Sequence, residues 1–233
     1  MKITYHLKPG ANTLPDNLST AEVPPEAESN SRMTSAWAHE LRATENLHKV
    51  PNDKPGWYRW RAPIQALEKL LDSTYISEKY MTQLMPFLHR KKFNRDDYFC
   101  IYIGVAINES IRDRLNWHVN QHHTKSAMQS GFLSTLRKTI SSLVSGNQYN
   151  EVATNGLIDH LLIEYYARDY PIKSDIAKSM IDKIGRDEME NNILPLNIMG
   201  NHHIMIQSFL ADLKKARKQS SRHIARDEHH AIY

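Results

Sequence analysis

Apolar, aromatic and β-branched residues run almost without interruption from residue 98 to residue 105, which predicts a strand buried on both faces. Residues 57–61 alternate instead, so a second strand would carry Tyr58 and Trp60 on one face. Residues 160–168 alternate in the same way. The pattern therefore predicts three strands.

Helical spacing of apolar residues marks the segments between and after these strands. Segments 64–71 and 76–87 predict a helical insertion between the first two strands. Asn108 is a suitable N-cap for a helix that follows the second strand. Further helices are predicted at residues 132–144, 174–184, 186–194 and 204–217. This order of elements predicts an α+β fold, in which helices cover a small sheet.

The chain divides into three predicted parts. Six of the ten prolines precede residue 56, so residues 1–55 are expected to form an extended N-terminal arm with one short helix at 33–48. Residues 56–218 form the predicted folded domain, and the helical insertion spans 62–96. Residues 219–233 are a polar C-terminal tail.

Composition narrows the class of protein only a little. Lysine and arginine outnumber aspartate and glutamate by 30 to 26, and the net charge of +4 is compatible with a polyanionic partner. Cys100 is the one cysteine, which excludes an intrachain disulfide and a thiolate-rich zinc cluster. The longest apolar run is too short to span a bilayer. We therefore expect a soluble cytoplasmic protein.

Three short strings carry the candidate chemistry. Gly-Trp-Tyr at 56–58 lies on the first predicted strand, and Tyr-Ile-Gly at 102–104 lies on the second. Arg114 and His118 follow, four residues apart, on the predicted helix. Together these strings resemble the signature of the GIY-YIG nucleases. The resemblance implies a three-stranded antiparallel sheet flanked by helices, and it implies DNA cleavage.

The resemblance also implies a role for each side chain. Tyr58 would activate water or contact the phosphate, with Tyr102 in support. Arg114 would bind the phosphate, with His118 one turn further along the helix. The stretch before this helix is longer than in the shortest family members, so Arg112 is an alternative to Arg114. Taken singly, a strand tyrosine or a helix arginine is more often structural than catalytic.

A magnesium site is the third implication of the resemblance. Family members hold Mg²⁺ with a glutamate on the helix after the third strand, ahead of a proline and an asparagine, and residues 189–197 resemble that segment. Glu190 is preferred, Glu188 is a near-equal alternative, and Asn197 would fix the local geometry. Glu164 is a third candidate, although its place within a strand favours an outward-facing ion pair. One carboxylate with phosphate oxygens and waters suffices for Mg²⁺.

Basic side chains outside the signature are expected to contact the DNA backbone, where they would position the protein without specifying a sequence. These are Arg112, Lys125, Arg137 and Lys138. The histidines at 118, 122 and 123 have ligand-like spacing, but a zinc site would need a further ligand from elsewhere. We therefore expect Mg²⁺ rather than zinc.

Two departures from the compact family pattern narrow the expected function. Trp57 replaces a small apolar residue, and the half-motifs lie 44 residues apart, as long insertions in type II restriction endonucleases allow. We expect an enzyme of that type, which acts on double-stranded DNA as a homodimer and accompanies a cognate DNA methyltransferase. Alternatives are a GIY-YIG nuclease of DNA repair or mobile elements, and a non-catalytic DNA-binding protein. A helical protein-interaction module would show no salt-dependent DNA affinity.

Overall fold

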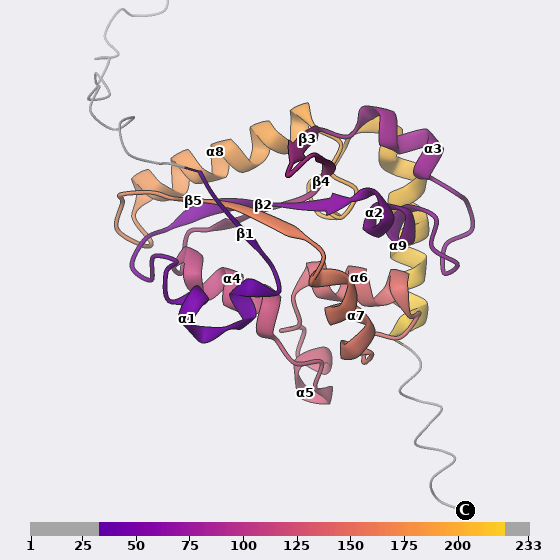
Figure 1. The fold of residues 1–233 in the computed structure, drawn as a ribbon, viewed down its shortest axis with the longest axis horizontal. Helices are drawn as coiled ribbons and strands as arrows, with labels where there is room; N and C mark the ends of the chain where they lie inside the picture. The colour runs from indigo at the N-terminus through magenta and orange to yellow at the C-terminus, as the bar shows by residue number, and fades with distance from the viewer. Residues whose placement is uncertain (1–32, 222–233) are drawn as a thin grey trace, which may run out of the picture. The chain divides into compact units, whose positions relative to one another are not determined.

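Five antiparallel strands form the sheet, in the spatial order β1-β5-β2-β4-β3 (Figure 1). This computed structural model describes residues 33–221. The strands are β1 (Thr34–Trp37), β2 (Gly56–Pro63), β3 (Arg90–Phe93), β4 (Asp96–Ala106) and β5 (Leu162–Ala167). Strands β2, β4 and β5 are the three that the sequence predicts. The expectation of a three-stranded sheet is wrong, because β1 and β3, too short to show a clear alternation, extend it at both edges.

Helices cover both faces of the sheet (Figure 1). Helix α8 (Asp175–Asn191) lies along one face, and α4 (Ile111–Asn120), α6 (Thr135–Val144) and α7 (Glu151–Ile158) lie on the other. The remaining elements are η2 (Glu40–Arg42), α1 (Thr44–Leu47), α2 (Ile64–Leu71), α3 (Met81–Leu84), η3 (Met85–Phe87), α5 (Lys125–Gln129), η4 (Ile204–Ile206) and α9 (Gln207–Ser220). Among the described residues, no helix is long and apolar enough to cross a membrane.

Alternation along β2 sends its side chains to both helical layers. Tyr58 and Trp60 contact His118 of α4, which confirms that they share a face. Arg59 points the other way and pairs with Glu188 of α8. A large apolar core packs on the α4 face, and a smaller one packs beneath α8. The two faces of β2 therefore have different neighbours and different chemistry.

Residues 34–47 belong to the folded unit rather than to an extended arm. The helix expected at 33–48 is wrong, because the segment begins as β1, which pairs with β5, and then turns into η2 and α1. Pairing with a neighbouring strand has overridden the local helical spacing. Residues 1–32 of the expected arm and 222–233 of the expected tail lie outside the described residues.

Helix boundaries differ from the expected ones in two further places. Ser110, not Asn108, caps α4, because its side chain accepts a backbone N–H of the first turn. The helices expected at 174–184 and 186–194 form one helix, α8, because Gly185 lies buried inside it instead of ending it. Helix α7 was not expected.

Candidate active site

Tyr58, Tyr102 and His118 meet on the α4 face of the sheet. Tyr58 comes from β2, Tyr102 from the neighbouring β4, and His118 from α4. The Tyr58 hydroxyl lies 2.5 Å from Nε2 of His118, and the centroids of the two tyrosine rings are 6.4 Å apart. The structure therefore brings together three residues that the sequence assigns to one site.

The two tyrosines differ in their access to solvent. Only 1% of Tyr58 is exposed, and its ring lies over Gly104. Tyr102 is only partly buried. Tyr102 is therefore better placed than Tyr58 to touch a substrate.

Gly104 has no room for a side chain, so Gly104→Ala is expected to displace Tyr58. A Cβ atom there would overlap the Tyr58 hydroxyl, and the surrounding core prevents Tyr58 from swinging aside. The free energy of unfolding should fall by about 1–3 kcal/mol, as chemical denaturation would measure. Gly156→Ala is the control, since its Cβ meets open space on α7 and should stabilise by about 0.5–1 kcal/mol. A Gly104→Ala protein as stable as the wild type would contradict this packing.

Arg114 brings a positive charge to the tyrosines. Its guanidinium pairs with Glu109 at 2.7 Å and lies over the Trp117 ring, 4.8 Å from the centroid. Its Nε atom is buried and has no hydrogen-bond partner among the described residues. A phosphate oxygen would satisfy this donor, because guanidinium N–H groups match the geometry of phosphate oxygens.

The buried groups of the site are uncharged at neutral pH. Burial, together with the charges of Arg114 and Arg137, lowers the pKa of His118 to about 3. Burial raises the pKa of Tyr58 well above its usual value, and the neighbouring Tyr102 adds to this effect. Burial also raises the pKa of Tyr102, although Arg114 opposes the increase. The charge of Arg114 therefore faces neutral hydroxyl and imidazole groups, an arrangement suited to an anionic substrate.

Asn197 anchors the outer edge of β4 next to the site. Its side-chain oxygen accepts the Ile103 N–H at 2.8 Å, and its amide donates to the Ile103 carbonyl at 2.9 Å. The Leu196 N–H adds a bond to the Ile101 carbonyl at 2.9 Å. Tyr102 thus lies between two anchored residues. The expected role of Asn197 in the active site stays a prediction, which these bonds to the Ile103 backbone do not test.

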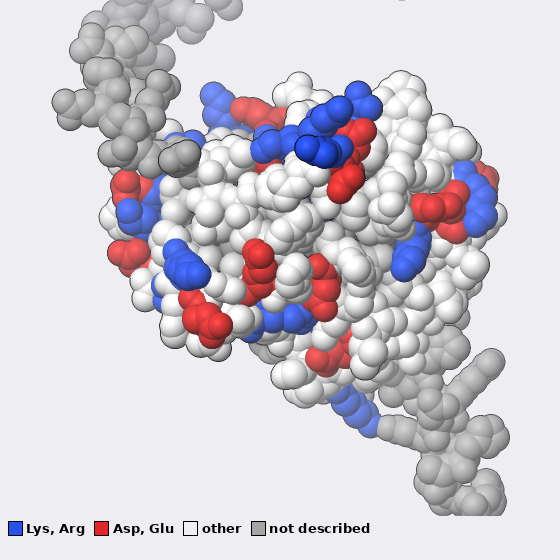
Figure 2. All heavy atoms as spheres, in the orientation of Figure 1, with Lys and Arg blue, Asp and Glu red and all other residues white. Residues whose placement is uncertain are grey.

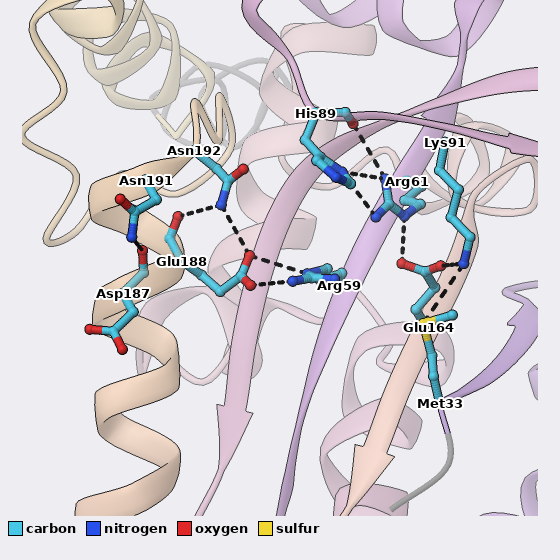
Figure 3. Close-up of polar contacts among 10 residues, drawn as sticks. All are labelled: Met33, Arg59, Arg61, His89, Lys91, Glu164, Asp187, Glu188, Asn191 and Asn192. Carbon is cyan, nitrogen blue, oxygen red and sulfur yellow. Dashed lines mark hydrogen bonds and ion pairs between the residues drawn. The ribbon is translucent and has the colours of Figure 1, made fainter.

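Glu188 and Glu190 do not join the tyrosines, because α8 lies on the opposite face of the sheet (Figure 1). Figure 3 shows the Glu188 carboxylate held by two hydrogen bonds from Arg59. Glu190 is exposed in a groove of about 450 Å³ that it shares with His202 and His203. Neither glutamate therefore occupies the expected position beside the tyrosines.

Another carboxylate of the same helix, Asp182, lies where α8 meets the edge of β4. It lines a groove of about 150 Å³ together with Gly104 and Asn197. Asp182 forms no ion pair with another described residue. The α8 side of the groove consists of residues at helical spacing, namely Asp182, Gly185, Arg186 and Met189. That stripe is the sequence signal that could have identified Asp182.

Glu164 forms the expected ion pair, but inside the protein. It is fully buried and bonds to Arg61 and to Lys91, each at 2.5 Å (Figure 3). The expected outward-facing position is wrong, because β1 makes β5 an interior strand and Lys91 of β3 reaches over it. Its charge is therefore already neutralised within the fold.

The spacing of the histidines does not build a zinc site. Helix α4 ends at Asn120, so His122 leaves the helix and pairs with Glu151 at 2.9 Å. His123 turns to a backbone carbonyl instead. In the part of the chain that the structure describes, no group of three or more His, Cys, Asp or Glu residues can hold a metal ion.

The residues expected to contact the DNA backbone lie in different environments. Arg137 is fully buried and donates to the last carbonyls of α4, so the expected DNA contact is wrong. Arg112 donates to two backbone carbonyls of the segment before β2. Lys125 is exposed, and Lys138 is partly buried. Figure 2 shows acidic side chains interspersed with basic ones, so the face in view has no continuous basic surface.

A comparison with models of known protein families matches the part of the chain that contains these residues. The GIY-YIG catalytic domain, as a family model, matches residues 56–219. That span includes both tyrosines, Arg114 and His118, and it includes helix α8. Neither the comparison with curated proteins nor the comparison with solved structures found a match.

Proposed function

We propose, because the chain belongs to the GIY-YIG family of nucleases, that it is a metal-dependent endonuclease that cuts double-stranded DNA at specific sites. The observation that carries this proposal is the meeting of Tyr58, Tyr102 and His118 beside Arg114. The buried Nε donor of Arg114 lacks a partner among the described residues. A phosphodiester oxygen would supply that partner.

Tyr102 is the group that meets the reacting water in this proposal. It is partly exposed, so it could first lose its own proton to solvent, and the phenolate would then take the proton of the water that attacks phosphorus. Arg114 would bind a phosphoryl oxygen and stabilise the charge that develops there. Tyr58 and His118, whose rings contact Tyr102, would fix its orientation. These assignments exchange the roles that the sequence interpretation gave to the two tyrosines.

Asp182 is the carboxylate that we propose as the metal ligand. Members of the family generally use a divalent metal ion, which would stabilise the leaving oxygen. Mg²⁺ takes oxygen ligands and keeps several waters, so one carboxylate in an open groove fits its chemistry. Arg59 already neutralises Glu188. Glu190 has no ion-pair partner among the described residues and is the second candidate.

Asp182→Ala is expected to weaken Mg²⁺ binding by more than about tenfold and to abolish metal-dependent cleavage. Calorimetric titration of the intact protein with Mg²⁺ measures binding without relying on activity. Glu190→Ala tests the preference drawn from the sequence, and Asp187→Ala, exposed on the same helix, is the charge-matched control. Loss of binding in Glu190→Ala but not in Asp182→Ala would contradict our assignment.

Restriction-type specificity is the finer part of the proposal. The segments between β2 and β4 and between α4 and β5 add surface to the minimal sheet, and that surface would recognise bases. Because one active site cuts one strand, we propose a homodimer on DNA. Protection of the host genome would require a cognate DNA methyltransferase.

Digestion of unmethylated phage and plasmid DNA, with Mg²⁺ and with a chelator, tests this function. We expect discrete fragments that form only with metal. A smear would indicate unspecific cutting, as in a repair or mobile-element nuclease, and would count against restriction. A folded protein that binds DNA without cutting it would contradict catalysis and support a purely DNA-binding role.

A further inference from the structure

Ser134 lies directly behind His118, at the inner end of a row of hydroxyl and imidazole groups. Its Oγ atom is 2.7 Å from Nδ1 of His118, and Nε2 of the same ring is 2.5 Å from the Tyr58 hydroxyl. The Tyr102 ring lies next to Tyr58, with the two ring centroids 6.4 Å apart. Three side chains from three different elements are thus hydrogen-bonded in series, and Tyr102 lies next to the last of them.

The direction of these hydrogen bonds follows from the groups that Ser134 can satisfy. Ser134 is fully buried, and its oxygen already accepts the Arg137 N–H as the cap of α6. If Oγ also accepted a hydrogen bond from His118, the Ser134 O–H would have no acceptor among the described residues. A buried donor without an acceptor is strongly disfavoured. Donation from Ser134 to Nδ1 satisfies every group.

We propose that Ser134 is a positioning residue, which donates to Nδ1 of His118 and thereby places the single ring proton on Nε2. Nε2 then donates to the Tyr58 oxygen, and the Tyr58 hydroxyl is left to donate to Tyr102. His118 has only one N–H to place, because it is neutral near pH 7. Burial raises the pKa of Tyr102, and the charge of Arg114 and the neighbouring Tyr58 act against that increase.

The surroundings hold Ser134 in this position. Oε1 of Gln121 accepts the Ser134 N–H at 2.7 Å, and Nε2 of Gln121 donates to a carbonyl of the same loop at 2.8 Å. Arg137 donates to the His118 carbonyl at 2.9 Å. The charged groups that face the row are Arg114, Arg137 and Glu109. The two arginines disfavour protonation of the imidazole.

The inference deepens the proposed reaction, and its kinetic consequence rests on that reaction. A phenolate on Tyr102 would receive the hydrogen bond from Tyr58, which favours the charged base. Without Ser134, the ring proton of His118 is free to move to Nδ1. Tyr58 would then donate to Nε2 instead, and its hydroxyl could no longer donate to Tyr102.

Nitrogen-15 NMR of histidine-labelled protein at neutral pH tests the position of the proton directly. We expect Nε2–H in the wild type and a substantial Nδ1–H population in Ser134→Ala. Ser134→Thr, which keeps the hydroxyl, should restore Nε2–H. A wild-type proton on Nδ1, or an unchanged ring in Ser134→Ala, would overturn the inference. The NMR result does not depend on DNA cleavage, so a failure of this inference can be distinguished from a failure of the proposed function.

Cleavage kinetics test the consequence for Tyr102. Ser134→Ala should lower kcat by about tenfold and shift the rising limb of the pH profile upward by about one unit, with DNA affinity unchanged. Asn150→Ala is the matched control, because it removes the N-cap of α7, where no histidine is attached. Equal losses in both variants without a pH shift would mean that Ser134 acts through stability alone, which contradicts the proposal.

Discussion

Replacing Arg114 with alanine is expected to reduce the rate of DNA cleavage by about 10²–10³-fold, the loss typical of a group that stabilises transition-state charge. The guanidinium is the cation beside the two tyrosines, and no described residue occupies its Nε donor. Its pair with Glu109 is partly exposed, so the free energy of unfolding should change by less than about 1 kcal/mol. Single-turnover cleavage at saturating DNA separates the loss in chemistry from a loss in binding.

Two variants serve as controls for Arg114→Ala. Arg114→Lys keeps the charge but loses the planar donors, so its rate should be intermediate. Arg95→Ala removes the same charge from the exposed turn between β3 and β4, at the far end of β4 from Tyr102, and should cleave at nearly the wild-type rate. Wild-type cleavage by Arg114→Ala would remove Arg114 from the proposed mechanism.

The largest effect on stability is expected from Glu164→Ala, which should lower the free energy of unfolding by about 3–5 kcal/mol. The substitution leaves Arg61, only 1% exposed, without its carboxylate inside the protein. Lys91 reaches water more easily and loses less. Denaturant unfolding monitored by tryptophan fluorescence measures the change.

Two further variants test the cause of this loss of stability: one breaks an exposed ion pair, and the other replaces the buried ion pair with apolar residues. Asp169→Ala breaks an exposed pair with Lys54 and should cost less than about 1 kcal/mol. The double variant Arg61→Met with Glu164→Leu removes both buried charges and should recover most of the stability. If the double variant is as unstable as Glu164→Ala, then the loss comes from packing rather than from an unpaired charge.

Acid should weaken the wild type more than it weakens Glu164→Gln. Burial raises the pKa of Glu164, but hydrogen bonds from Lys91 and Arg61 outweigh it, and the pKa lies below its ordinary value of 4.5. A carboxylate with a lowered pKa stabilises the fold above its unfolded pKa, and this contribution is lost as the pH falls through the folded value. The difference between the two proteins should therefore shrink below pH 4.5.

Local patterns in the sequence were sufficient to predict the central strands of the sheet and the helix that carries Arg114 and His118. The alternation of β2 identified the shared face of Tyr58 and Trp60, because side chains on a strand alternate whatever surrounds them. The four-residue spacing of Arg114 and His118 placed both on one side of α4, because that spacing is close to one helical turn. The strings around 56–58 and 102–104 were enough to indicate the family.

The same patterns could not show which neighbours cover each face. Arg137 and Lys138 are adjacent basic residues, yet only Arg137 is fully buried, because it caps the end of α4. The sequence predicted an outward-facing Glu164, but β1 pairs with β5 and makes it an interior strand, where Glu164 pairs with Arg61. Burial depends on contacts between elements far apart in the chain, and a local period contains no information about them.

The sequence by itself determined the family, the central strands and the set of tyrosine, histidine and arginine side chains, because each rests on spacing within one element. Only the tertiary structure decided that Tyr102 rather than Tyr58 is partly exposed, and that Glu188 and Glu190 lie across the sheet from both. It also placed Asp182 at the edge of β4. These features arise where strands and helices pack against each other, and packing selects the exposed face of each element.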